Sequence, residues 1–207
     1  GNMSDIGAAG DAQKAYDAGV TIGTYLKQLG FNVDYAPVAD VLTNPGNTAI
    51  GTRSFGSDAS MVADMVIKEL EGLSSQGVFG AVKHFPGQGG VSGDSHDGAV
   101  TLDKSLEELM QTELVPFQKA LENGVSFVMV GHISVPQVVG DNTPASLSQM
   151  MVSNVLREQL GYQGIVITDA MNMGAVTGNY TADQAAVMAV NAGVDMILMP
   201  QDYETAY

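Results

Sequence analysis

Segments of two kinds alternate along this chain. In the first kind, apolar residues recur every three to four positions, which is typical of helices that bury one face. This spacing predicts helices over about residues 11–29, 57–74, 106–121, 149–160 and 182–192. The second kind is short and mainly apolar, which is typical of buried strands. It predicts strands over about residues 31–38, 78–83, 125–130, 164–168 and 196–199.

Residues at the predicted helix ends support these assignments. Ser57 and Thr181 are suited to cap the helices that follow them, because their hydroxyls can accept a backbone hydrogen bond there. Ser105 and Glu108 form a capping-box pattern at the start of the third predicted helix. Pro116 lies inside that helix, so we expect the helix to be kinked or split.

The order of the predicted elements indicates the fold class. Four of the five predicted strands are almost continuously apolar, whereas the strand over 31–38 is mixed. Continuously apolar strands are typical of sheets that are covered on both faces. Regular alternation of strands and helices predicts a parallel sheet with right-handed crossovers. The expected fold class is therefore α/β, in a single domain over residues 1–207.

Polar residues follow the predicted strands directly. They are Asp40, Lys83, His84, His132 and Asp169. The carboxyl ends of parallel strands meet at one edge of a sheet, where α/β proteins carry their active sites. One loop at this edge, residues 83–96, contains four glycines, a proline, two histidines and an aspartate. We expect the chemistry of the protein to depend on this loop and on Asp169.

The composition narrows the possible functions. Eight basic and 23 acidic residues give a formal net charge of −15, which argues against binding to nucleic acids or anionic membranes. The absence of cysteine excludes disulfides, thiolate metal sites and cysteine nucleophiles. No apolar run approaches the ~20 residues that cross a bilayer, and no signal-peptide pattern opens the sequence.

Five blocks of sequence carry a resemblance to a known family. They lie at residues 35–41, 50–55, 83–89, 94–96 and 166–171. The third reads Lys-His-Phe-Pro-Gly-Gln-Gly, the fourth Asp-Ser-His, and the fifth Val-Ile-Thr-Asp-Ala-Met. In this order they resemble the N-terminal domain of glycoside hydrolase family 3. The Asp-Ser-His block resembles the motif of the family's β-N-acetylglucosaminidase branch and separates that branch from the family's β-glucosidases.

The resemblance implies a (β/α)8 barrel of the TIM-barrel type. The five predicted strands would be its fourth to eighth strands, so the chain is expected to be a fragment that forms an incomplete barrel of about five β-α units. Open sheet edges expose apolar surface, and we expect the chain to self-associate through them or to be unstable. Little or no activity is expected of such a fragment alone.

The resemblance also implies a function. Members of this branch are retaining glycoside hydrolases that remove terminal β-linked N-acetylglucosamine from peptidoglycan-type or related saccharides, without a cofactor. The nucleophile would be Asp169, and the general acid/base would be His96, oriented by Asp94. This chemistry requires a carboxylate nucleophile and a second group that works first as acid and then as base. An imidazole, with an unperturbed pKa near ~6.5, can take the second role.

Four further residues match binding positions of the family. Arg53, Lys83 and His84 match sugar-binding positions, and their side chains can donate hydrogen bonds to sugar hydroxyls. Asp40 matches a recurrent acidic position, which we group with them. The glycines of the loop are expected to let His96 move over a bound substrate.

Simpler interpretations exist for single residues. Asp169 alone is compatible with a helix N-cap, and His96 alone is compatible with a solvated loop residue. For His132 we expect a core position, in which both ring nitrogens find partners within the protein. The joint pattern of motifs favours the functional interpretation.

Two other functions compete with glycoside hydrolysis. The first is a metal-dependent hydrolase, with ligands among Asp94, His96, Asp97 and His84, although their spacing fits no defined zinc motif. The second is a non-catalytic barrel that at most binds sugars. A phosphate-binding loop is disfavoured, because residues 87–90 lack the lysine and hydroxyl that end a P-loop.

Overall fold

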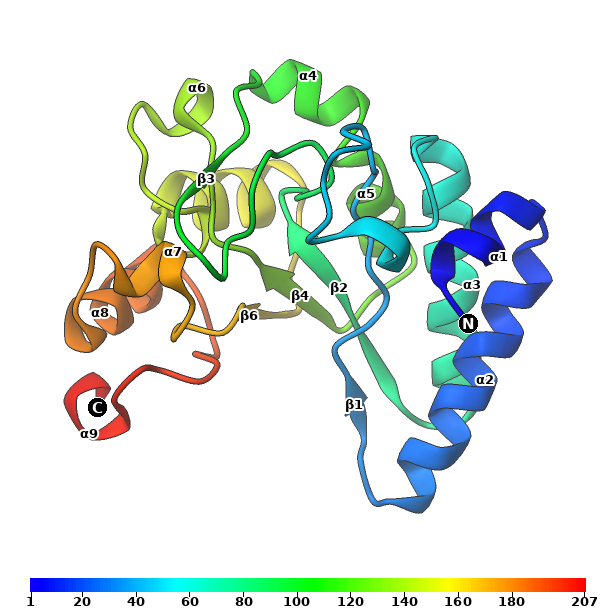
Figure 1. The fold of residues 1–207 in the computed structure, drawn as a ribbon. Coiled ribbons are helices and arrows are strands. Elements are labelled where there is room, and N and C mark those ends of the chain that lie inside the picture. Colours follow the sequence, from blue (N-terminus) through cyan, green and yellow to red (C-terminus); the bar gives the residue numbers. More distant parts are fainter.

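A parallel β-sheet forms the centre of the computed structural model, which describes residues 1–207 (Figure 1). Its strands are β1 (Val33–Asp34), β2 (Phe79–Phe85), β4 (Phe127–Val130) and β6 (Ile165–Thr168). They pair in parallel and in chain order, β1-β2-β4-β6. Doubly wound sheets reverse their strand order at a switch point, whereas barrels keep it. The structure confirms the α/β class and has the strand order of a TIM barrel.

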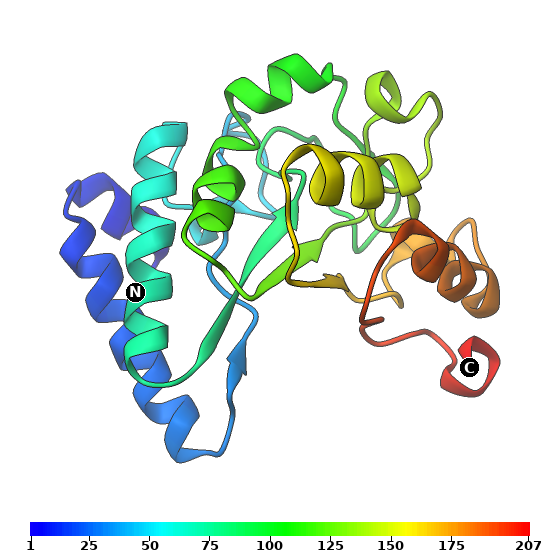
Figure 2. The ribbon, with the colours of Figure 1, turned by 180° about the vertical axis from the view of Figure 1, so that it is seen from behind.

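Helices connect the strands and pack on one side of the sheet. Seen from behind, α3 (Ala59–Ser75), α5 (Val115–Glu122) and the helix η3 (Met150–Gln159) lie on the viewer's side of the strands (Figure 2). The helices that correspond to the predicted ones are α2 (Ala12–Gln28), α3 (Ala59–Ser75), α4 (Leu106–Gln111), α5 (Val115–Glu122), η3 (Met150–Gln159) and α8 (Ala182–Ala192). All of them fall within the five predicted helical ranges or within one residue of these. None of the helices combines the length and apolar composition needed to cross a membrane.

The packing of α2 against α3 depends on small residues. A Cβ atom added to Gly72 would lie 2.2 Å from the Tyr16 carbonyl oxygen, and one added to Gly19 would lie 2.3 Å from the Glu69 carbonyl oxygen. The two helix backbones therefore touch where the sequence places glycine. This contact holds α2 over α3, which packs in turn against β2.

The helix ends agree with the predictions except at one position. Asp58, and not Ser57, caps α3, with its carboxylate accepting from the Met61 amide at 2.7 Å. Asp58 follows Ser57 directly, and its carboxylate lies where it can accept from a free backbone amide of the first helical turn. The predicted capping box at Ser105 is present, and Thr181 is the N-cap residue of α8, as predicted, with its backbone amide donating to Gln184 Oε1 at 3.1 Å. Pro116 lies in the first turn of α5, where its missing N–H costs no hydrogen bond, and the predicted helix is split there into α4 and α5.

Three predicted elements differ in form. In the predicted last strand only Met196 pairs, through one parallel bridge to Ile167. The predicted first strand is reduced to the two residues of β1 and an isolated bridge between Val38 and Lys83. The helix η3 is wound as a π-helix, with hydrogen bonds such as that from the Leu160 amide to the Val155 carbonyl. The spacing of apolar residues places such a helix but does not reveal its winding.

The smaller elements were not predicted, and several border the site. Strands β3 (Val100–Thr101) and β5 (Ile133–Ser134) form a separate parallel pair above the main sheet. The short helices are α1 (Met3–Ala9), η1 (Gly51–Arg53), α6 (Pro136–Val139), η2 (Ala145–Leu147), α7 (Gly174–Thr177) and α9 (Tyr203–Ala206). These segments are too short to show a period in the sequence.

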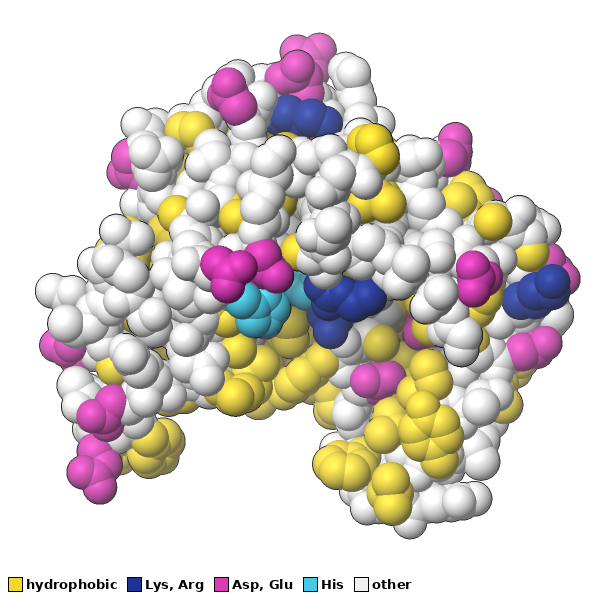
Figure 3. Space-filling model, in the orientation of Figure 1, with side chains coloured by type: hydrophobic (Ala, Val, Ile, Leu, Met, Phe, Trp, Pro, Cys, Tyr) yellow, Lys and Arg dark blue, Asp and Glu magenta, His cyan; other side chains and the backbone are white.

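Apolar side chains are exposed on the face of the sheet away from the helices. Figure 3 shows them in the hollow below the charged residues of the front face. Phe79 at the start of β2 and Ile165 at the start of β6 are among the exposed large apolar residues of the chain, at 54% and 37% exposed. β1 pairs only with β2, so one edge of the sheet is open.

Self-association of the 207-residue chain is the expected consequence of this open edge. Size-exclusion chromatography with light scattering at micromolar concentration should show oligomers, or else rapid loss of soluble protein. A stable, monodisperse monomer would contradict this expectation.

Glu69 is a buried carboxyl group that weakens the fold at neutral pH. It lies in α3, is 1% exposed, and its Oε2 atom has no hydrogen-bond partner in the protein. Burial, with the Asp34 carboxylate as the second cause, raises the pKa of Glu69 to about 8. The folded state therefore holds a proton that the unfolded state releases above its ordinary pKa of 4.5.

Glu69→Gln should stabilise the protein at neutral and alkaline pH. The contribution of the wild-type carboxyl group to the free energy of unfolding is fully present below pH 4.5 and is lost as the pH rises through about 8. The gain should therefore grow over that window and reach about 3 kcal/mol at pH 7. Urea unfolding from pH 5 to 9 measures it, with the exposed Glu71→Gln in the same helix as control. An identical pH dependence in Glu69→Gln and the wild type would refute this assignment.

Candidate active site

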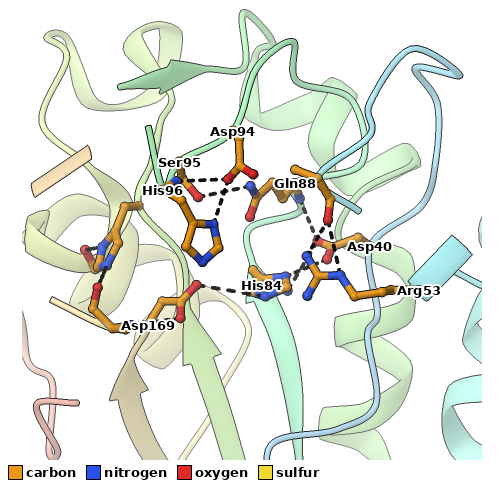
Figure 4. Close-up of polar contacts among 12 residues, drawn as sticks. Asp40, Arg53, His84, Gln88, Asp94, Ser95, His96 and Asp169 are labelled. Carbon is orange, nitrogen blue, oxygen red and sulfur yellow. Dashed lines mark hydrogen bonds and ion pairs between the residues drawn. The ribbon is translucent and has the colours of Figure 1, made fainter. Parts of the chain in front are cut away.

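The polar residues predicted to meet at one edge of the sheet do meet there. Figure 4 shows His84 between Asp40 and Asp169, with Asp94 and His96 on the loop above. His84 Nδ1 lies 2.7 Å from Asp40 Oδ2, and His84 Nε2 lies 3.9 Å from Asp169 Oδ2. Asp40 lies after β1, His84 at the end of β2 and Asp169 directly after β6, so three of the four strands of the sheet supply this cluster.

Asp169 follows β6 and presents one oxygen atom to the site. Its Oδ1 atom accepts a hydrogen bond from the Ala170 amide at 2.8 Å, and its Oδ2 atom faces His84. The side chain is 17% exposed. The next helix, α7, begins at Gly174 with Met173 at its N-cap position, so Asp169 does not cap a helix. Asp169 is thus a fixed carboxylate with one oxygen free toward the cluster.

Asp40 is buried behind His84. Its Oδ1 atom accepts from the backbone amides of His84 at 3.2 Å and Gln88 at 2.6 Å, while Oδ2 accepts from His84 Nδ1. The residue is 0% exposed. All of these contacts are internal, so the carboxylate faces the protein rather than the open side of the site. Asp40 was grouped with the substrate-binding residues from the sequence, and the structure instead places it beneath one of them.

Lys83 and Arg53 provide positive charge beside the cluster. Burial, followed by the Arg53 guanidinium, lowers the pKa of the Lys83 ammonium, whereas the carboxylates of Asp169, Asp34 and Asp40 act in the opposite direction. Arg53 lies at the end of η1, and its Nη2 atom donates to the Ala49 carbonyl at 2.6 Å. Figure 4 shows its guanidinium group on the open side of Asp40 and His84.

Asp94 and His96 form a pair at the tip of the loop. Asp94 Oδ1 accepts from the His96 amide at 2.9 Å and lies 2.7 Å from His96 Nδ1. The backbone hydrogen bond, and next the side-chain one, lower the pKa of the Asp94 carboxyl. The side chains are 37% and 67% exposed, so the imidazole reaches into open space with its Nε2 atom free.

The base of this loop is tightly packed. A Cβ atom added to Gly87 would lie 2.7 Å from the Glu113 Cβ atom, and one added to Gly89 would lie 2.0 Å from the Val41 carbonyl oxygen. At Gly98, by contrast, an added Cβ would meet no atom within 4 Å. The first glycines of the loop therefore serve close packing. Movement of His96 over a substrate remains a prediction.

His132 is a core histidine, as expected. It is 1% exposed, and burial lowers the pKa of its imidazole. The neutral ring donates from Nε2 to the Ala170 carbonyl at 3.0 Å, and Nδ1 accepts from the Ser146 hydroxyl at 2.7 Å. His132 thus fixes the backbone next to Asp169 without presenting a free nitrogen atom.

The residues considered as metal ligands do not gather. No group of three histidine or acidic side chains in residues 1–207 is arranged so that it could hold a metal ion. Asp94 and His96 are bonded to each other, whereas His84 is bonded to Asp40. The metal-dependent alternative gains no support from the geometry.

Two residues of the site were overlooked in the sequence. Gln88 is 3% exposed and donates from its side-chain Nε2 to the Ser95 hydroxyl at 3.1 Å. Both lie within motifs that the sequence shows, but no spacing rule pairs an amide with a serine seven residues away. The signal available in the sequence is the presence of a long polar side chain within a glycine-rich stretch.

Comparison with known proteins agrees with this geometry. The model of the glycosyl hydrolase family 3 N terminal domain matches residues 2–207. Beta-hexosaminidase A of Pseudoalteromonas piscicida is 35% identical over 97% of this chain and 36% of its own length. Beta-hexosaminidase LpqI of Mycobacterium bovis is 38% identical over 90% of this chain and 49% of its own length.

A solved structure matches the whole chain. A glycoside hydrolase family 3 β-N-acetylglucosaminidase from Paenibacillus sp. str. FPU-7 superposes with a TM-score of 0.96 and 42% identity, over 100% of this chain and 40% of that one. The chain thus spans between about a third and a half of the relatives named here. Because the family model matches almost every residue, the chain belongs to glycoside hydrolase family 3, to its N-terminal domain.

Proposed function

We propose that this domain serves a retaining glycoside hydrolase that removes terminal β-linked N-acetylglucosamine. The observation that carries the proposal is the meeting of Asp169 with His84 at one rim of the sheet, below the loop that carries Asp94 and His96. A retaining mechanism requires a nucleophilic carboxylate and a separate proton donor at one bond. The names of the relatives, β-hexosaminidase and β-N-acetylglucosaminidase, support this class of substrate.

Asp169 is the proposed nucleophile. Its Oδ1 atom is held by the Ala170 amide, which leaves Oδ2 to attack the anomeric carbon. A rigid strand end limits the positions that this oxygen atom can adopt, and such positioning is a large part of catalysis. In the first step the leaving group departs from the sugar as the bond to Oδ2 forms; water then cleaves the glycosyl-enzyme ester.

His96 is the proposed acid and base. In the first step its Nε2 atom gives a proton to the departing oxygen, and in the second step it takes a proton from water. Asp94 holds Nδ1 at 2.7 Å and so fixes the tautomer that leaves Nε2 free. Since its hydrogen bonds lower the pKa of Asp94, this partner stays ionised throughout the neutral range and stabilises the imidazolium.

Lys83, His84 and Arg53 are the proposed sugar-binding residues. Lys83 and Arg53 supply donors beside the cluster, and the His84 Nε2 atom faces the space where the hydroxyls of a sugar bound to Asp169 would lie and can accept from one of them. Asp40 has a different proposed role. It holds the proton of His84 on Nδ1, which turns Nε2 toward Asp169 and the sugar.

Turnover of a chromogenic N-acetyl-β-glucosaminide tests the proposal. The complete gene product should release the chromophore from this substrate much faster than from the matching β-glucoside. The 207-residue chain, assayed beside it, should show little or no turnover, because the edge of β1 is open next to the site. If the complete protein binds N-acetylglucosaminides but hydrolyses none of them, the non-catalytic alternative is correct.

A further inference from the structure

The base of the loop is tied to its tip through one side chain. Gln88 makes three buried contacts: its amide nitrogen donates to Asp40 Oδ1 at 2.6 Å, its carbonyl accepts from Asn47 Nδ2 at 2.6 Å, and its side-chain Nε2 donates to Ser95 Oγ at 3.1 Å. The backbone contacts fix Gln88 relative to the sheet. The side-chain contact then reaches across the loop to the residue between Asp94 and His96.

Ser95 is held from a second side as well. Its carbonyl accepts from the Ala175 amide at 3.0 Å, and the His96 carbonyl accepts from the Gly174 amide at 3.0 Å. Ser95 is 1% exposed, although the side chains on either side of it are open to solvent. The exposed acid/base pair therefore stands on a buried serine that is clamped between Gln88 and the start of α7.

We infer that Gln88 is a positioning residue of this active site, which sets the place of the Asp94–His96 pair relative to Asp169. The inference rests on the proposed function. Asp40 connects the two halves of the arrangement, because the same carboxylate orients His84 and receives the Gln88 amide. Placement of the sugar-binding histidine and of the acid/base histidine is thus determined by one buried network.

The buried polar groups make this network sensitive to substitution. If the side-chain carboxamide of Gln88 is removed, the Ser95 hydroxyl loses a buried partner, and the tip is held only by the backbone hydrogen bonds to α7. Proton transfer to a leaving group depends on geometry, whereas binding of the sugar at Lys83 and His84 does not depend on the loop tip. Loss of the side-chain carboxamide should therefore lower kcat for a substrate with a poor leaving group and leave its KM nearly unchanged.

Enzyme kinetics of Gln88→Leu in the complete gene product tests the inference. With an aryl N-acetylglucosaminide that has a poor leaving group, kcat/KM should fall roughly 10- to 100-fold, and with a good leaving group less than about 3-fold, because kcat/KM reports the first step. Ser95→Ala should have a similar effect, and the double variant should be no worse than either single one. Gln88→Glu, which can accept from the Ser95 hydroxyl, should recover part of the loss. Gln118→Leu, in α5, is the matched control.

Hydrogen exchange supplies a readout that needs no activity. The amides of Asp97, Gly174 and Ala175 bond to the loop backbone and should exchange at least about tenfold faster in Gln88→Leu, with the core strands unchanged. Unchanged exchange, or equal losses of kcat/KM for good and poor leaving groups, would overturn the inference. A wild-type protein that hydrolyses no glycoside would instead overturn the proposed function, and the exchange result would still decide the role of Gln88.

Discussion

Replacing Asp169 by alanine in the complete gene product is expected to lower hydrolysis of N-acetylglucosaminides by about 10⁴-fold or more, since removing a nucleophile can eliminate most of the catalysed reaction. The loss should appear in kcat for all leaving groups, because the carboxylate forms a bond in every turnover. The fold should survive, because Asp169 accepts only one backbone hydrogen bond, from the adjacent Ala170 amide.

Azide and a control variant make this result specific. Azide can occupy the space of the missing carboxylate and attack the anomeric carbon from the same face, so it should restore turnover with an activated substrate and give a glycosyl azide of inverted configuration. Asp97→Ala removes a carboxylate from the exposed loop nearby and should retain most of the activity. Retained hydrolysis in Asp169→Ala would remove this residue as nucleophile.

Replacing His96 by alanine is the second large expected effect, and it should depend on the leaving group. With a poor leaving group, loss of the proton donor should lower kcat/KM, which reports the first step, by about 10²- to 10⁴-fold. With a good leaving group, the first step needs little protonation, so the loss there should be far smaller. Steady-state kinetics with a series of aryl glycosides measures this difference.

The Asp94–His96 contact predicts how the activity depends on pH. Its hydrogen bonds keep the pKa of Asp94 below its ordinary value, so Asp94 is ionised across the neutral pH range. In Asp94→Asn the imidazolium loses this partner, and the alkaline limb of the kcat/KM profile should move to lower pH. His132→Gln, at a buried histidine whose two ring nitrogens are both bonded within the protein, is a control for general damage to the site. Equal losses for good and poor leaving groups in His96→Ala would exclude it as the acid.

The arrangement of the strands could be predicted from the sequence because it follows from simple periodicity. Apolar runs that alternate with helical patterns require parallel strands, and their carboxyl ends then have to lie at one rim. That argument placed Lys83, His84 and Asp169 together, and the structure has His84 Nε2 at 3.9 Å from Asp169 Oδ2. His132 was also recognised correctly as a core residue.

The contacts within the loop could not be predicted in the same way. The burial of Asp40 depends on the path of residues 84–88, whose backbone amides converge on its carboxylate. The contact of Gln88 with Ser95 depends on how the loop folds back on itself. Neither contact follows from a period or a motif, so tertiary packing decides them. The α3 cap at Asp58 shows the same limit over a distance of one residue.

The identity of the nucleophile is tested most directly by trapping the glycosyl-enzyme intermediate. A fluorinated N-acetylglucosaminyl fluoride that reacts quickly but is hydrolysed slowly should leave one sugar covalently bound to the complete gene product. Peptide mapping by mass spectrometry should place that sugar on the carboxylate of Asp169. A covalent sugar on any other residue, or turnover that inverts the anomeric configuration and leaves no covalent adduct, would contradict the account.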